Sequence, residues 1–355
     1  MKNKIMTVLA VFALIATPNP TKIISQQLAN KLEDVAEAGA KPKVENTEET
    51  KEDNLYYNKG VLAAENKNYD EAIDEFTKAI VMNSKNIFAL YGRATVYYEL
   101  GKKNEALKDL NKILKLNKND EKVLSLRAAI YQQQNEYKNA IDDYEDLIKL
   151  NPNSDNYFLN LGYCYQSAGN KTKAIDDYLK AEKLGNSSNE LIINLIGLLY
   201  EAKDYTQTLN YISKAYDKKI VNSNIVGINL DILLSRQECD EAETLFEKQN
   251  SLIDAKGEVL QGIANCYFQQ TNYQKASELF IQSYKTNPEL IESVFNSGVA
   301  NLKDKKIDNA LLDFQLFLDK TKDRKDLDNL RLDAQKQIDF FHKKNQMKSD
   351  TLNKY

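Results

Sequence analysis

Small residues recur along this chain at a fixed spacing of 34 positions, and this period constrains its fold more than any other feature. The column consists of Ala72, Ala106, Ala140, Ala174, Ala242, Ala276 and Ala310, with Thr208 at the one remaining place. Such a period indicates repeated units that bury their apolar faces only against their neighbours. Because the spacing never slips over eight units, residues 53–324 are predicted to form one array.

Two further columns keep the same phase. A mostly small column, twelve positions earlier, contains Gly60, Ala94, Ala128, Gly162, Ile196, Leu230, Ala264 and Gly298. A large apolar column, four positions later, contains Phe76, Leu110, Tyr144, Tyr178, Ile212, Phe246, Phe280 and Phe314. A short polar break such as residues 65–68 divides each unit, which predicts two helices joined by a tight turn. The large residues Ile196 and Leu230 predict a change of curvature near residues 190–255.

This pattern resembles the tetratricopeptide repeat (TPR), and the best single copy runs from Tyr56 through Gly60 and Tyr69 to Phe76 and Ala79. The resemblance implies an all-α, right-handed TPR superhelix, an α-solenoid whose first helices line a concave groove. The predicted units, within which positions are counted from the first residue, are 53–86, 87–120, 121–154, 155–188, 189–222, 223–256, 257–290 and 291–324.

Composition agrees with a helical, folded and slightly acidic protein. The chain of 355 residues has only 12 Gly and 5 Pro, too few for a turn-rich β-sandwich. Its 42% of apolar residues excludes disorder throughout the chain. The 48 basic residues against 52 acidic ones, and several Glu at possible groove positions, argue against nucleic acid as a partner.

The N-terminus has the pattern of a secretory signal. Lys2 and Lys4 precede an apolar run from Ile5 to Ala16, which fits a signal core and is too short to span a bilayer. Residues 1–16 are therefore predicted to be a signal peptide that exports the chain to the periplasm, the cell surface or the medium. The alternative is an uncleaved membrane anchor, in which case only residues 1–16 contact the membrane. Residues 17–52 are predicted to be a flexible linker, with residues 23–38 as a candidate short helix before its most polar part.

The C-terminus departs from the repeat. Its apolar residues follow helical spacing, at Leu327, Leu330, Ala334, Ile338 and Phe341. This predicts a helix over residues 325–345 that resembles the capping helix of such arrays, followed by a disordered tail over 346–355.

Residue types that carry catalysis or bind metals are scarce. His342 is the single histidine, and the chain has no glycine-rich phosphate loop. Cys164, Cys239 and Cys266 lack metal-site spacing and are expected to be small core residues. Cys164 and Cys266 occupy the same position three units apart and should not meet, and an odd count leaves at least one free thiol. The sequence predicts no enzyme, no cofactor and no metal.

A binding surface is the better hypothesis. The resemblance implies that positions two, five, six, nine and twelve of each first helix face the groove. An asparagine side chain both donates and accepts hydrogen bonds and can pair with an extended peptide, and aromatic rings are strong interface anchors. The candidates for a partner-binding groove are Tyr57, Asn58, Tyr91, Tyr98, Asn160, Tyr163, Asn194, Tyr200, Phe268 and Asn296. The alternative is that the asparagines are ordinary polar surface.

The leading functional hypothesis is a non-enzymatic scaffold of the cell envelope that holds a protein or extended peptide. The alternative is an envelope module that binds a glycan or small peptide and supports secretion, outer-membrane assembly or polysaccharide export. A chaperone tail is not expected as the ligand. The family's carboxylate clamp needs Lys at position five, where this chain has none, and Lys122 fits only one element of the clamp.

Overall fold

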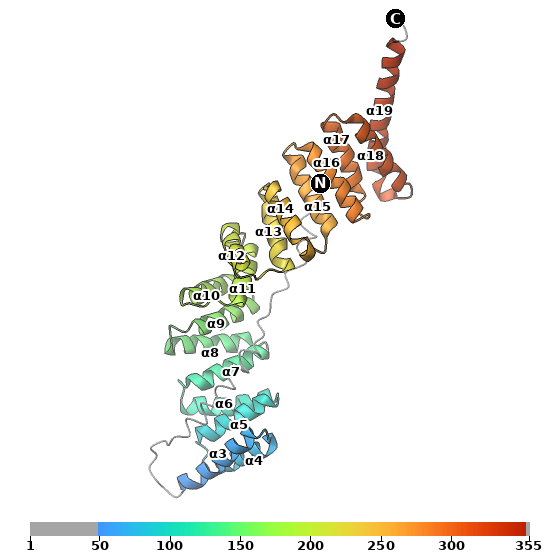
Figure 1. Ribbon diagram of the computed structural model, residues 1–355. Coiled ribbons are helices and arrows are strands. Elements are labelled where there is room, and N and C mark those ends of the chain that lie inside the picture. Colours follow the sequence, from blue (N-terminus) through green and yellow to red (C-terminus); the bar gives the residue numbers. More distant parts are fainter. Residues whose placement is uncertain (1–48, 353–355) are drawn as a thin grey trace. The chain divides into compact units, whose positions relative to one another are not determined.

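The computed structural model describes residues 49–352, with side chains from 52 to 347 (Figure 1). The predicted signal peptide or anchor over residues 1–16, the linker up to residue 48 and residues 353–355 lie outside the described residues. The chain divides into two compact units, whose described parts are residues 49–199 and 200–352. The division falls in the stretch 190–255, where large residues interrupt the small column.

Every regular element in the described part of the chain is helical, which confirms the predicted all-α array. The first four hairpins are α3 (Glu49–Glu65) with α4 (Tyr69–Met82), α5 (Ile87–Glu99) with α6 (Lys103–Leu116), α7 (Glu121–Gln133) with α8 (Tyr137–Leu150), and α9 (Asp155–Ser167) with α10 (Lys171–Lys183). The others are α11 (Asn189–Glu201) with α12 (Tyr205–Asp217), α13 (Ser223–Ser235) with α14 (Cys239–Gln249), α15 (Lys256–Gln269) with α16 (Tyr273–Thr286), and α17 (Glu292–Lys303) with α18 (Ile307–Lys320). A short 3-10 turn, η2 (Asn250–Leu252), follows α14.

The turn inside each hairpin has the same backbone conformation in all eight repeats. Position fifteen has a positive φ each time, at Lys67, Gly101, Asn135, Gly169, Lys203, Gln237, Thr271 and Lys305. Only two of these residues are glycine, the residue that adopts this region without a steric penalty. Packing of the two helices therefore imposes the turn, even on the β-branched Thr271 at φ 64°.

The small and large columns meet inside the hairpins that have glycine in the small column. A Cβ atom added to Gly60 would lie 2.6 Å from the Phe76 ring, and one added to Gly298 would lie 2.7 Å from the Phe314 ring. Both rings are fully buried. The first helix therefore needs a residue without a bulky side chain where the second helix places its aromatic ring.

The C-terminal end of the array is covered by the helix α19 (Asp328–Leu352), which follows the short turn η3 (Lys325–Leu327). Leu327, Ala334 and Ile338 are buried in one cluster with Phe314 and Phe317 of the last hairpin. The helix continues past residue 345, so the disordered tail predicted from residue 346 is wrong as far as Leu352. At the other end, α3 begins at Glu49, inside the segment predicted as linker. In both places polar residues with good helix propensity extend a helix that apolar periodicity did not mark.

The three cysteines do not share one role, contrary to the expectation that all are small core residues. Cys239 at the start of α14 and Cys266 in α15 form a disulfide with a Cα–Cα distance of 5.8 Å. Position seventeen of one repeat lies against position ten of the next, which brings these two residues together. Cys164 is a buried free thiol, and burial raises its pKa to about 12.

Candidate interaction surface of the first helices

The first helices leave one side open to solvent in a regular pattern. Position five is half-buried in every repeat, at Tyr57, Tyr91, Ser125, Leu159, Ile193, Gly227, Gln261 and Phe295. Position two is exposed in the first four repeats and half-buried in the others. We call positions two, five, six, nine and twelve the first-helix face.

Aromatic residues dominate this face at the N-terminal end. The ring of Tyr57 lies 6.0 Å from that of Phe76 and 6.1 Å from that of Phe88, measured between centroids. Phe88 is 49% exposed. Burial raises the pKa of Tyr57 and raises that of Tyr91 to about 12. Both phenols are therefore neutral near pH 7, and this end presents an uncharged aromatic surface.

The four asparagines at position six have different environments. Asn58 is exposed and Asn296 is half-buried. Asn160 donates from Nδ2 to the backbone carbonyl of Asn156 at 2.9 Å. Asn194 is 3% exposed, and its Nδ2 donates to the hydroxyl of Tyr178 at 3.1 Å.

The prediction that Asn194 contacts a partner is therefore wrong. Tyr178 of the fourth repeat reaches the first helix of the fifth repeat, and Asn194 supplies the polar atom that this buried hydroxyl needs. Counting repeat positions could not show this, because the sequence does not say how far a neighbouring ring extends.

Two candidate tyrosines form hydrogen bonds between consecutive first helices. The Tyr98 hydroxyl accepts a hydrogen bond from Nε2 of Gln133 on the next first helix. Tyr200 donates to Oδ2 of Asp231 at 2.5 Å, and burial followed by this bond raises its pKa. A third such bond, in which the Tyr157 hydroxyl donates to Oε1 of Glu121 at 2.6 Å, involves residues that were not candidates from the sequence. These bonds join neighbouring first helices through half-buried tyrosines.

Two further aromatic candidates, Tyr163 and Phe268, pack first helices against second helices. Tyr163 meets Tyr137 edge to face at a centroid distance of 6.3 Å, and Phe268 meets Tyr273 at 5.3 Å. Both candidates are half-buried. These ring contacts hold both side chains in fixed orientations. Binding a ligand would therefore cost little further side-chain entropy.

Sequence reasoning missed a set of ionic contacts between the two helices of a hairpin. Arg93 contacts Asp109, and its Nη1 also donates to Thr77 Oγ1 at 2.9 Å. Arg127 contacts Asp143 in the same way in the next repeat. Position seven thus meets position twenty-three, sixteen residues later. That spacing could have been found by comparing charges column by column.

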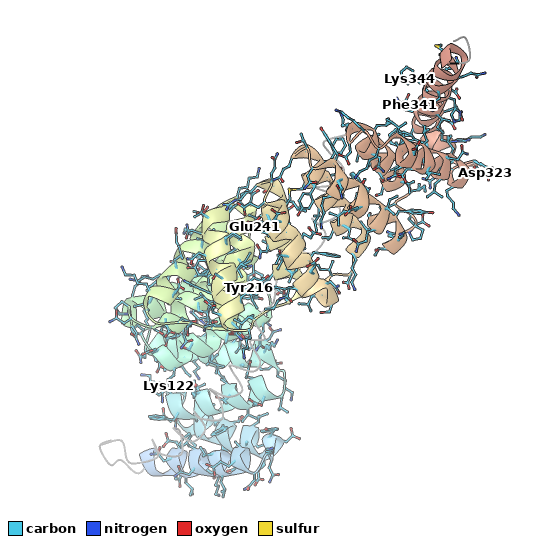
Figure 2. All side chains as sticks on the ribbon, turned by 45° about the horizontal axis from the view of Figure 1, so that its top comes forward. Lys122, Tyr216, Glu241, Asp323, Phe341 and Lys344 are labelled. Atoms are coloured by element: carbon cyan, nitrogen blue, oxygen red, sulfur yellow. A yellow bond between two sulfur atoms is a disulfide. The ribbon has the colours of Figure 1, made fainter. Side chains whose placement is uncertain are left out.

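Lys122, which fits one element of the carboxylate clamp, is exposed at the start of α7 (Figure 2). Among the residues that the structure describes, no group of three or more His, Cys, Asp or Glu is arranged to hold a metal ion. No helix between residues 49 and 352 is both long and apolar enough to cross a bilayer.

One family profile matches part of the chain. Residues 62–176 match the sequence profile of the Psidin N-terminal TPR repeats region. A comparison with curated proteins finds no match.

Three solved structures illustrate the similarity. A tetratricopeptide repeat protein from Parabacteroides merdae ATCC 43184 is 16% identical, with 70% of this chain and 99% of that chain covered and a TM-score of 0.45. MamA from Desulfovibrio magneticus RS-1 is 19% identical, covering 47% and 94% with a TM-score of 0.44. A further MamA structure is 21% identical, covering 48% and 93% with a TM-score of 0.45.

The profile match covers the first four repeats only in part. The hairpins after it nevertheless keep the same 34-residue phase and the same turn conformation. Over residues 62–176 the chain is similar to a tetratricopeptide-repeat region, and its hairpins continue with the same period on to residue 320.

Proposed function

We propose that this protein is an exported, non-enzymatic scaffold that binds a partner protein or an extended peptide on its first-helix face. The observation that carries the proposal is the regular opening of that face. The residue at position five is half-buried, and so partly open to solvent, in all eight repeats. The residues at positions three and ten are buried in nearly all of them. An extended partner meets a series of similar contacts along such a face, and TPR arrays are built to supply extended surfaces of this kind.

The chemistry of the face favours peptide over a charged ligand. Phe88 and the edge of Tyr57 offer apolar anchors, and Asn58 offers a nearby amide. Aromatic residues at fixed positions contribute most of the binding energy in many interfaces. Amide side chains pair with peptide backbone regardless of sequence.

Two features support export. Residues 1–16 have the composition of a secretory signal. The Cys239–Cys266 disulfide joins neighbouring repeats, and structural disulfides persist in oxidising compartments such as the periplasm or the extracellular space.

The test is affinity capture from envelope and soluble extracts with three baits. One is the wild-type chain. The second carries Asn58→Ala, Asn160→Ala and Asn296→Ala on the first-helix face. The third, a matched control, carries Asn139→Ala, Asn210→Ala and Asn309→Ala at exposed positions of second helices.

A protein retained by the wild type and the control but lost from the first-helix variant supports the proposal. A protein lost only from the control moves the interface to the second helices. If all three baits retain nothing but the wild type binds on a glycan array, the chain is a ligand-binding module and the scaffold proposal is wrong. Secretion of a fusion to residues 1–16 tests export separately.

A further inference from the structure

The N-terminal end of the array exposes apolar residues at two positions that are buried in nearly all later repeats. Leu55 and Leu62, at positions three and ten of α3, are 53% and 60% exposed. The residues at position ten in the other repeats are Val96, Ile130, Cys164, Leu198, Ile232, Cys266 and Ala300, and none is more than 3% exposed. Cys266 shows what such a residue contacts, because it is bonded to Cys239 of the preceding repeat. Within the described residues, no helix precedes α3.

Position three follows the same rule. Its residues in the later repeats are Ala89, Val123, Tyr157, Leu191, Ile225, Val259 and Ser293, all buried except the half-buried Tyr157. We call the side of α3 that carries Leu55 and Leu62 its outer side, and among the described residues nothing covers it as positions three and ten are covered in the later repeats. Exposed leucines at such a site favour a covering element, because burying a leucine contributes about 1.5–3 kcal/mol.

At the C-terminal end, α19 covers the apolar residues of the last hairpin. Leu330, Ala334, Ile338 and Phe341 follow one another at steps of four, four and three residues along this helix. Ala334 and Ile338 are buried, and Leu330 packs on the same cluster. Beyond them the helix continues into the polar stretch that includes Lys344 (Figure 2).

The sequence before α3 contains the same pattern of steps. Ile24, Leu28, Leu32 and Val35 are also spaced by four, four and three residues. Residues with this spacing would lie in one stripe on one side of a helix, and Gln26, Asn30 and Glu33 would lie on the opposite side. Gly39 follows, and glycine commonly terminates helices.

The connection is long enough for this segment to reach α3. Residues 37–48 separate the stripe from the start of α3. Twelve residues span up to about 40 Å when extended, whereas the 17 residues of α3 measure about 25 Å along the helix axis. A tethered segment also has a high effective concentration, which a second copy of the chain lacks.

We propose that residues 24–36 form an N-terminal capping helix that packs across the outer side of α3 and covers Leu55 and Leu62. The segment does for the first repeat what α19 does for the last. It also assigns a structural role to the stretch between the predicted signal and the polar part of the linker. The proposal is independent of what binds the first-helix face.

Hydrogen exchange on the full chain tests the cap with three variants. Leu28→Asp with Leu32→Asp places charge in the apolar stripe. Gln26→Asp with Asn30→Asp adds the same charge to the opposite side of the same segment and is the matched control. Leu62→Asp alters the docking surface on α3 instead of the segment.

In the wild type and in the control, amides 28–36 are expected to exchange at least about tenfold more slowly than in the stripe variant. Leu62→Asp is expected to remove the same protection while the later repeats stay protected. Size-exclusion chromatography with light scattering should give a monomer in each case.

Two results would overturn the proposal. In one, amides 28–36 exchange equally fast in all four proteins. In the other, the wild type is a dimer whose α3 stays protected in the stripe variant, which shows that a second copy covers Leu55 and Leu62.

Discussion

Arg127 and Asp143 form a two-point ion pair between α7 and α8. Nε of Arg127 donates to Oδ2 at 2.9 Å, and Nη2 donates to Oδ1 at 2.5 Å. The fourth repeat keeps the carboxylate, as Asp177, but Leu161 stands where the arginine is expected. Burial, with a further contribution from Asp176, raises the pKa of Asp177 to about 7. A pattern that stabilises two hairpins thus leaves a costly charge in a third.

Asp177→Asn is expected to stabilise the protein at pH 8 by about 1–2 kcal/mol, a value reduced for solvent screening of this half-buried group. The folded-state pKa of Asp177, about 7, lies above its ordinary value of 3.8. Its protonated form therefore favours folding, and this contribution is complete below pH 4 and lost as the pH rises through 7. Urea unfolding of both proteins between pH 4 and pH 8 measures the difference, which should vanish at the acidic end.

Asp143→Asn is the matched control for this experiment. It deprives Arg127 of its buried partner, so it should destabilise the protein at pH 7, by about 1–3 kcal/mol. If both substitutions change the free energy of unfolding in the same direction, burial of the charged Asp177 carboxylate does not destabilise the protein.

A second prediction concerns the close approach of the two helices in the last hairpin. Gly298→Ala should destabilise the protein by about 1–2 kcal/mol, because the new methyl group would overlap the buried ring of Phe314. Gly197→Ala in α11 is the control. A Cβ there meets nothing within 4 Å, so this variant should gain up to about 1 kcal/mol from helix propensity.

The same contact can be tested by compensation. The second repeat pairs Ala94 with Leu110, so Gly298→Ala combined with Phe314→Leu should cost less than the sum of the two single changes. A double-mutant cycle from thermal unfolding measures this coupling. Additive effects would show that the ring and the glycine do not constrain one another.

The third prediction concerns the disulfide. Replacing Cys239 and Cys266 with alanine should lower the free energy of unfolding by about 2–4 kcal/mol, since the bond closes a loop of 27 residues. Reductant should lower the Tm of the wild type and leave that of the double variant unchanged.

Thiol labelling gives an independent check of the cysteines. Under denaturing conditions without reductant, the wild type should expose one thiol, that of Cys164. Three labelled thiols would contradict the pairing. In the native protein Cys164 should stay unlabelled, because it is buried and burial raises its pKa to about 12.

The fold could be predicted from the sequence because its determinants repeat. One small residue opposite one large residue, such as Gly60 and Phe76, signals little alone, but six such pairs in the same phase over eight repeats indicate a solenoid. The disulfide escaped prediction for a related reason. The repeat register puts position seventeen near position ten of the next unit, but only Cys239 and Cys266 have cysteine at both places.

The interaction surface was less predictable. Family positions indicate which side of a helix faces outward, and Asn58 and Tyr57 lie on that side. They do not indicate which polar groups the protein itself uses. Asn194 satisfies Tyr178, and Tyr98 bonds Gln133, because large side chains reach across repeat boundaries to distances that the spacing does not encode.

Helix α19 has a consequence for how such a chain can change in length. Its inner side packs on the last hairpin, while its other sides carry polar residues such as Asp328, Lys336 and Asp339 together with the exposed Leu332 and Phe340. The helix thus lies outside the 34-residue period that joins one repeat to the next. Duplication of whole 34-residue segments within the array would lengthen the protein and leave the terminal helix and its contacts unchanged.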